Sequence, residues 1–189
     1  MNTDEIQVRP ARADDRDRIL AVHLDAFGND EGPVIVSLLE EMLDDPTAEP
    51  IHSVVAESND EIVGHVLFTS VTIESSRESN DRATAQILAP LSVPSKLHGQ
   101  GIGTHLVQET LKQLAASGVQ LVFALGYPKY YSRFGFVPAG VLGFHAPYPI
   151  PEENAEAWMV LELEADAIKS VEGTVKCCEA LDHQKYWVE

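Results

Sequence analysis

Closely spaced glycines form the part of this sequence that most directly suggests chemistry. The segment reads His98-Gly99-Gln100-Gly101-Ile102-Gly103-Thr104, hereafter the glycine turn, and it precedes apolar residues with helical spacing. Glycines at the start of a helix leave backbone N–H groups accessible, and with the helix dipole these groups bind anions such as phosphate. A tight strand-to-helix turn without a ligand would have the same spacing, so the turn alone leaves both interpretations open.

Two common phosphate-binding motifs are excluded by their spacing. A dinucleotide-binding fingerprint requires a third glycine where this chain has Thr104 or Leu106, depending on the register. A P-loop requires a Gly-Lys-Ser/Thr ending, which Gly103-Thr104-His105 does not supply. A nucleotide phosphate would therefore have to be bound in another way.

Four further stretches accompany the glycine turn. They are Leu91-Ser92-Val93-Pro94 before it, the apolar run 119–125 after it, Tyr130-Tyr131-Ser132-Arg133-Phe134-Gly135-Phe136, and residues 159–163. Together with His98-x-x-Gly101-x-Gly103 they resemble the GNAT superfamily of acetyl-CoA-dependent N-acyltransferases, over about residues 6–136, and a bacterial N-acetyltransferase subgroup within it. Two positions depart from the family pattern. His98 replaces Arg or Gln, and the Asn that many members carry is absent around residues 126–128.

The resemblance implies an N-acetyltransferase that moves an acetyl group from acetyl-CoA to a primary amine of a small molecule or peptide, directly and in a ternary complex. Tyr131 would donate a proton to the leaving thiolate as general acid, with Tyr130 as a packed neighbour. Lys96 and Lys129 would contact the 3′-phosphate or would be solvated surface side chains. The implied coenzyme-binding residues are Leu91, Ser92 and Val93 for the pantetheine arm, and His98, Gly99, Gln100, Gly101, Ile102, Gly103 and Thr104 for the pyrophosphate.

Several side chains could remove the proton from the amine, which is mostly protonated at pH 7 if its pKa is about 10.4. The candidates are Glu57 near a strand end, His65 inside a β-rich run, and Asp30 or Glu31 between two helices. A water chain that leads to solvent would serve without any of them. The other histidines, His23, His105 and His145 among them, show no metal-ligand spacing, so no metal is predicted.

A mixed α/β fold must position these residues. Apolar spacing predicts helices over 13–28, 34–45, 103–117 and 127–134, and strands over 53–57, 61–73, 83–93, 119–125, 158–163 and 174–178, with a loop over 74–82. The first two strands predict an antiparallel hairpin, and the strand, turn, helix, strand order around the glycine turn predicts a parallel pair. The resemblance implies a single GNAT-like domain over residues 1–189. Its central mixed sheet would then be mostly antiparallel, with a splayed parallel strand pair, and would be flanked by helices.

Charge divides the chain into three segments. Thirteen Lys and Arg stand against thirty Asp and Glu, for a net charge of −17, which argues against nucleic acid or an anionic membrane as partner. Residues 83–151 carry four basic side chains and a single acid, Glu109, whereas both flanks are strongly acidic. We expect an anionic coenzyme on the basic segment and a cationic amine acceptor. Residues 27–31, residues 147–149 and the acidic C-terminus are candidate parts of the acceptor site.

The remaining features concern the location of the protein, its cysteines and the alternatives that the sequence leaves open. No stretch reaches the roughly 18 apolar residues of a membrane span, and the N-terminus lacks a signal-peptide pattern, so we expect a cytoplasmic protein. Cys177 and Cys178 are adjacent, which favours reduced thiols. The sequence leaves open whether the chain forms a homo-oligomer. It also leaves two other functions open: a non-catalytic acyl-CoA-binding or regulatory module of the same fold, and a structural domain without a ligand.

Overall fold

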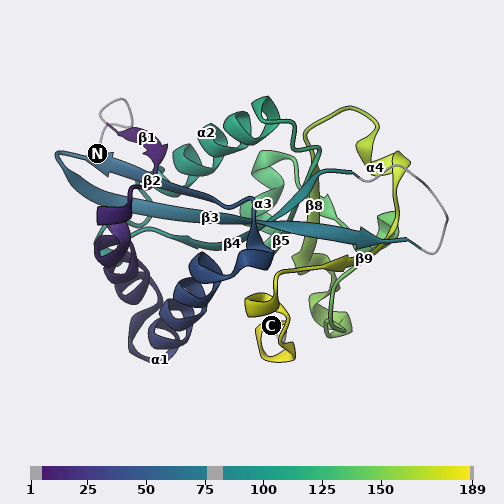
Figure 1. The fold of residues 1–189 in the computed structure, drawn as a ribbon, viewed down its shortest axis with the longest axis horizontal. Helices are drawn as coiled ribbons and strands as arrows, with labels where there is room; N and C mark the ends of the chain where they lie inside the picture. Colours follow the sequence, from purple (N-terminus) through teal and green to yellow (C-terminus); the bar gives the residue numbers. More distant parts are fainter. Residues whose placement is uncertain (1–5, 76–82, 188–189) are drawn as a thin grey trace.

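One sheet runs through the computed structural model, which describes residues 6–75 and 83–187 (Figure 1). The strands are β1 (Gln7–Pro10), β2 (His52–Ser58), β3 (Glu61–Glu74), β4 (Ala85–Ser92), β5 (Leu121–Leu125), β6 (Val137–Pro138), β7 (Phe144–His145), β8 (Trp158–Glu162) and β9 (Gly173–Lys176). Their main order is β1-β2-β3-β4-β5-β8-β6, and β9 joins β3 to β7. The pairs β4–β5 and β7–β9 are parallel and the others antiparallel, which confirms the expected mixed, mostly antiparallel sheet.

The predicted strands are all present, with ends shifted by at most two residues. The β2–β3 hairpin turns at Asn59 and Asp60, which both have the positive φ that such tight turns require. Three short strands, β1, β6 and β7, were not predicted, because two to four residues are too few to show a period. The predicted loop 74–82 begins within β3 at Glu74, and residues 76–82 lie outside the described part of the chain.

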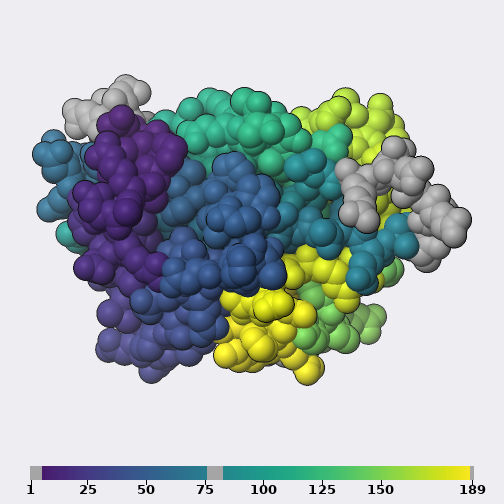
Figure 2. Space-filling model, in the orientation of Figure 1, coloured from purple at the N-terminus to yellow at the C-terminus, as the bar shows by residue number. Residues whose placement is uncertain are grey.

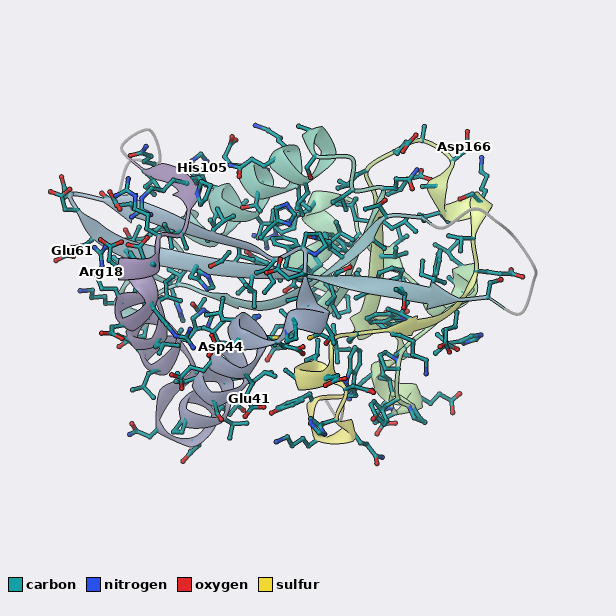
Figure 3. The ribbon with its side chains drawn as sticks, viewed as in Figure 1. Arg18, Glu41, Asp44, Glu61, His105 and Asp166 are labelled. Carbon is teal, nitrogen blue, oxygen red and sulfur yellow. The ribbon has the colours of Figure 1, made fainter. Side chains whose placement is uncertain are left out.

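Helix α1 (Arg16–Asp44) is a pair of helical segments that meet at Gly28. Gly28 has φ 71° and ψ −167°, a combination that essentially only glycine adopts, and the chain folds back there into a V (Figure 1). Arg16 and Asp44, from the two ends of α1, form a two-pronged ion pair with distances of 2.8 and 2.6 Å; Asp44 is labelled in Figure 3. The expectation that residues 27–31 form a loop between two helices was therefore wrong: helical structure resumes directly after Gly28.

The two long helices cover opposite faces of the sheet. Helix α2 (Ile102–Ala116) packs on one face, and both segments of α1 pack on the other (Figure 1). The α1 face carries alternate residues of the central strands, including Val55, Leu67, Ile87 and Phe123, whereas their sequence neighbours face α2. This alternation places the side chains of β3 and β4 in two separate cores.

The C-terminal residues 179–187 pack against the second segment of α1 (Figure 2). The backbone N–H groups of Glu179 and Ala180 donate to the side chains of Thr47 and Asp45, both at 2.9 Å. Trp187 is 1% exposed, and its indole N–H donates to the Leu181 carbonyl at 3.1 Å. Residues 179–187 are thus held in place by hydrogen bonds and by the burial of Trp187.

Two smaller elements complete the described fold, α3 (Pro128–Tyr131) and α4 (Ala167–Ser170). No helix within residues 6–75 and 83–187 combines the length and the apolar character that crossing a bilayer requires. Cys177 and Cys178 are both free thiols, and burial raises the pKa of each.

Candidate active site

The parallel strands β4 and β5 separate toward their C-terminal ends. Their register runs from Ala85 opposite Leu121 to Leu88 opposite Ala124, and the described residues continue it no further. Beyond Leu88 the pairing of β4 with β3 shifts across Ala89 and Pro90, and it resumes at Leu91 and Ser92. The end of β4 therefore has a partner strand on its β3 side, and on the side toward β5 its edge is open.

The glycine turn closes this gap from one end. Gly99 and Gly101 have φ of 75° and 82°, the left-handed region that favours glycine, and α2 begins directly afterwards at Ile102. A Cβ at Gly103 would lie 3.0 Å from the Tyr130 hydroxyl and 3.4 Å from Val93. The first turn of α2 therefore has room only for backbone at Gly103, and its leading N–H groups are free of intrahelical partners, as at any helix start.

His98 and Asp25 hold the segment between β4 and α2. The His98 Nε2 atom lies 2.7 Å from the Val93 carbonyl oxygen, so the ring bridges the strand end and the glycine turn. The backbone N–H of Ser95 donates to Asp25 of α1 at 2.6 Å. This hydrogen bond, with a smaller contribution from Lys96, holds the pKa of Asp25 below its usual range. The histidine that departs from the family pattern thus has a structural partner within the turn.

A cavity of about 1010 Å³ opens where β4 and β5 separate. On its β4 side it is lined by residues 87–93, 97–99, 101–104, 125–127, 130, 131 and 133. On its α1 side it is lined by Phe27, Asp30, Glu31, Val34, Ile35, Leu38, Leu181, Lys185, Tyr186 and Trp187. The β4 side comes wholly from the basic segment of the sequence, and the α1 side wholly from the two acidic flanks.

The two adjacent tyrosines line the β4 side of the cavity in different surroundings. Tyr131 is 8% exposed, and its ring lies so close to Gly126 that a Cβ there would be 2.8 Å from Cε2. Tyr130 bonds to the Thr104 side chain, and the guanidinium of Arg133 lies 4.8 Å from the centre of its ring. Burial raises the pKa of Tyr130. Tyr130 and Arg133 therefore brace the start of α2, while Tyr131 packs behind the end of β5.

The predicted coenzyme-binding residues come together with one exception. Leu91, Ser92, Val93 and all residues of the glycine turn except Gln100 line the cavity, whereas the Gln100 side chain turns back to the Lys96 carbonyl at 3.5 Å. Lys96 and Lys129 do not line the cavity, which fits solvated lysines. The sequence did not indicate Arg133 as a lining residue, although it belongs to the quoted YYxRFGF stretch.

The base candidates separate into three locations. Glu57 does not line the cavity; it is bonded to Arg9 on β1, whose Nε lies 2.9 Å from the carboxylate, and this position does not support a role as base. Asp30 and Glu31 do line the cavity. His65 is fully buried and lies 2.8 Å from His23, from ring nitrogen to ring nitrogen.

The residues predicted for the acceptor site are only partly in the cavity wall. Phe27, Asp30 and Glu31 line the cavity, as do Leu181 and residues 185–187 near the C-terminus, whereas residues 147–149 do not. Tyr148 instead supports the C-terminal segment by donating to the Asp182 carbonyl at 3.1 Å. His105 lies on α2, on the far face of the sheet from α1 (Figure 3). Across residues 6–75 and 83–187, no three His, Cys, Asp or Glu side chains are grouped so as to hold a metal ion.

Comparisons with known proteins agree with this arrangement. Residues 7–139 match the family model described as Acetyltransferase (GNAT) domain. The Escherichia coli (strain K12) protein named Uncharacterized N-acetyltransferase YjhQ is 38% identical over 167 residues, which cover 87% of this chain and 88% of that protein. The solved structure of E. coli YhbS in complex with CoA has a TM-score of 0.82 at 27% identity, covering 95% of this chain and 93% of that one. A GNAT family acetyltransferase from Brucella melitensis in complex with acetyl-CoA has a TM-score of 0.67 at 27% identity, covering 94% and 98% of the two chains.

Proposed function

The chain belongs to the GNAT family of acetyltransferases, which makes it an acetyl-CoA-dependent acyltransferase, and from this premise we propose that it acetylates a primary amine by direct transfer in a ternary complex. One observation carries the proposal: a single cavity joins the glycine turn, the open edge of β4 and Tyr131 to a second wall that carries two carboxylates. Both substrates would meet in that cavity, so no acyl-enzyme intermediate is needed.

The β4 side fits acetyl-CoA. The backbone groups at Leu91 and Val93 lie on an open strand edge, where the amide-bearing pantetheine arm can pair as an added strand would. The N–H groups of the glycine turn suit the pyrophosphate, and Gly103 lets the start of α2 lie close to Tyr130 and Val93. Arg133 is the cationic side chain on this side of the cavity, in a position to neutralise phosphate charge.

The reaction needs three proton movements. The ammonium must lose a proton before its nitrogen can bond to the acyl carbon, and the nitrogen loses a second proton as the amide forms. The sulfur that leaves when the C–S bond breaks must gain one. Tyr131 lines the cavity on the β4 side, and we assign it this last step as general acid. A backbone N–H at the end of β4 would stabilise the negative charge that develops on the carbonyl oxygen.

The α1 side suits an amine with an apolar body. Phe27, Val34, Ile35, Leu38 and Trp187 supply apolar surface, and Asp30 and Glu31 supply the negative charge that an ammonium group favours. Lys185 also lines this side, and its Nζ lies 4.6 Å from the centre of the Tyr186 ring. The acceptor we propose is therefore a cationic, amphipathic primary amine.

A thiol-release assay tests the function. Purified protein is mixed with acetyl-CoA and a panel of alkyl, arylalkyl and peptide amines, and free CoA is measured over time. We expect acceptor-dependent release, greatest for amines with an apolar body. Tight acetyl-CoA binding by calorimetry without release for any amine would favour a non-catalytic binding module instead.

A further inference from the structure

A buried pair of histidines lies next to the cavity and has no part in the reaction as described so far. His23 of α1 and His65 of β3 are both 0% exposed. His23 Nε2 lies 2.8 Å from His65 Nδ1, and His65 Nε2 lies 2.9 Å from the Ser53 hydroxyl on β2. Ser53 is only half-buried, so this chain of hydrogen bonds runs from the core to the molecular surface.

The other end of the chain reaches the cavity. His23 is stacked on Phe27, with the ring centres 6.2 Å apart, and Phe27 lines the α1 side. Ser92, which lines the β4 side, lies directly opposite His65 in the β3–β4 register. Opposite residues on an antiparallel pair project to the same face, so the Ser92 side chain is on the His65 face of the sheet.

Two polar atoms at this end lack partners. His23 Nδ1 and Ser92 Oγ are both buried, and neither has a hydrogen-bond partner within the described residues. Buried polar atoms are nearly always satisfied, because leaving one unpaired costs free energy. Both belong to side chains next to His65, so one water molecule that bonds to both atoms would satisfy them together.

We propose that Ser92, His23, His65 and Ser53 form the path by which the amine loses its proton. The path supplies a proton acceptor in place of Glu57, which does not line the cavity. It rests on the proposed acetyltransferase function, because only an amine acceptor requires the removal of this proton.

The proton movements balance along the path. With both rings neutral, His23 carries its proton on Nε2 and donates to His65 Nδ1, and His65 donates from Nε2 to Ser53. A proton that arrives at His23 Nδ1 from the ammonium, through Ser92 and water, displaces the Nε2 proton to His65 Nδ1. The His65 Nε2 proton then moves to Ser53, whose own proton passes to solvent. One proton enters and one leaves, and both rings then carry their proton on Nδ1. After the product has left, a solvent proton that moves in the opposite direction, from Ser53 through His65 to His23, releases the Nδ1 proton of His23 into the open cavity and restores the first tautomer of both rings.

The surroundings keep the two rings neutral. Burial lowers the pKa of His23 to about 3, and burial together with His23 lowers the pKa of His65 well below its usual value. The contacting side chains from α1, β2 and β4 are Phe27, Ser53 and Ser92, all uncharged. His23 and His65 are the titratable groups here, while Asp30 and Glu31 of α1 line the cavity itself. The pair therefore passes protons without storing charge at neutral pH.

The test compares His23→Gln and His65→Gln with the unchanged protein. Glutamine can still form hydrogen bonds but cannot exchange a proton between two nitrogens. We measure kcat/KM from about pH 6 to about pH 10 with an alkylamine that is protonated at neutral pH and with an aromatic amine that is already neutral. A loss of roughly 10²–10⁴-fold is expected for the alkylamine near pH 7. The loss should shrink toward pH 10 and be small for the aromatic amine, with the acetyl-CoA Kd unchanged.

His52→Gln is the matched control. His52 is also on β2 and bonds to Gln86 at 2.9 Å, outside the path, so its substitution should leave both pH profiles unchanged. If either buried glutamine prevents folding, Ser92→Ala removes the cavity end of the path with a minimal change in volume, and it should show the same dependence on pH and on the acceptor.

Three outcomes would overturn the path. A loss that is equal at every pH and for both amines would show a packing role only. Full activity of the variants at pH 7 with the alkylamine would show that the proton leaves by another route. An unchanged protein that acetylates no amine at all would overturn the proposed function and this path with it, and it is distinguished from the other two outcomes because the defect then precedes any substitution.

Discussion

Tyr131 and Tyr130 are adjacent in the sequence, but their side chains make different contacts in the structure. The Tyr130 hydroxyl is hydrogen-bonded to Thr104, and the guanidinium of Arg133 lies over the Tyr130 ring. Tyr131 is held edge-on by Tyr130 and Phe136, with ring centres 5.2 and 5.5 Å away, and it lies against the backbone of Gly126. Packing on three sides fixes the Tyr131 ring in the cavity wall, and a proton donor requires such a fixed position.

Replacement of Tyr131 by Phe should therefore lower kcat by roughly 10²-fold or more, because general acids contribute on that scale. The acetyl-CoA Kd should change little, since the ring that fills the site is retained. Steady-state kinetics and calorimetry measure the two quantities. Tyr130→Phe is the control: it loses the bond to Thr104, so we expect weaker coenzyme binding and a nearly normal kcat. An undiminished kcat in Tyr131→Phe would remove Tyr131 from the mechanism.

Individual residues also show where the sequence was informative and where it was not. Tyr131 and most of the glycine turn line the cavity, and the sequence indicated both because they belong to local motifs that it displays; their roles stay predictions. Glu57 was a plausible base from its place near a strand end, but its partner Arg9 lies 48 positions away. The pairing of His23 with His65 spans 42 positions. The first contact depends on the pairing of β1 with β2 and the second on the packing of α1 against the sheet, and no single-sequence period specifies either.

At the scale of elements, β1 is attached to the start of α1 by a buried charge cluster. Arg9 donates to Asp15 at 2.6 Å and also pairs with Glu57 on β2. Asp15 is fully buried and accepts a further bond from the Arg12 backbone N–H at 2.8 Å. The hydrogen bond from Arg9 is the main cause that holds the pKa of Asp15 far below its usual range.

Asp15→Asn should destabilise the protein by about 3 kcal/mol at pH 7, because it leaves Arg9 with one buried charge partner fewer. A depressed pKa stabilises the fold above the unfolded-state pKa of about 3.9, and this contribution is lost as pH falls toward the folded-state value. The difference between the two proteins should thus be constant near neutrality and shrink below about pH 4. Urea unfolding at several pH values measures it.

Asp44→Asn provides the control for Asp15, because its ion pair with Arg16 is exposed and should contribute no more than about 1 kcal/mol. Equal destabilisation by the two substitutions would contradict the role of the buried cluster.

The break in α1 is the second element-scale feature. A Cβ at Gly28 would meet no atom within 4 Å, so the cost of a substitution there is backbone strain alone. Gly28→Ala should destabilise by about 1–3 kcal/mol. It should also raise the acceptor KM, because Phe27 and Asp30 flank the break and line the cavity.

Gly140→Ala is the matched control, since a Cβ there is equally free and Gly140 has no positive φ. It should be nearly neutral in thermal unfolding and in kinetics. A Gly28→Ala variant as stable as Gly140→Ala would contradict the strain at the break. The helix prediction itself missed this geometry because Gly28 was interpreted as the end of one helix, whereas it is a joint between two helical segments.

At the scale of the whole molecule, the basic and acidic segments of the sequence form opposite sides of the cavity. The segment 83–151 forms the β4 side, with Arg133 near the glycine turn, and the acidic flanks form the α1 side, with Asp30 and Glu31. Glu41 of α1, beyond the cavity, adds to this negative charge (Figure 3), whereas the charge of Asp44 is compensated by Arg16. An anionic coenzyme would thus be attracted to the basic β4 side of the cavity, and a cationic acceptor to the acidic α1 side.

Salt should consequently weaken the acceptor side of the reaction. Raising the ionic strength from about 0.1 to about 1 M shortens the screening length from about 10 to about 3 Å. At saturating acetyl-CoA we expect the KM of a cationic amine to rise several-fold over this range, while the KM of an amine that is neutral at the same pH stays constant. In Asp30→Asn/Glu31→Gln the salt dependence should be reduced, and what is left of it measures the long-range field of the flanks. A KM of the cationic amine that does not respond to salt would mean that the acidity of the flanks has no part in substrate capture.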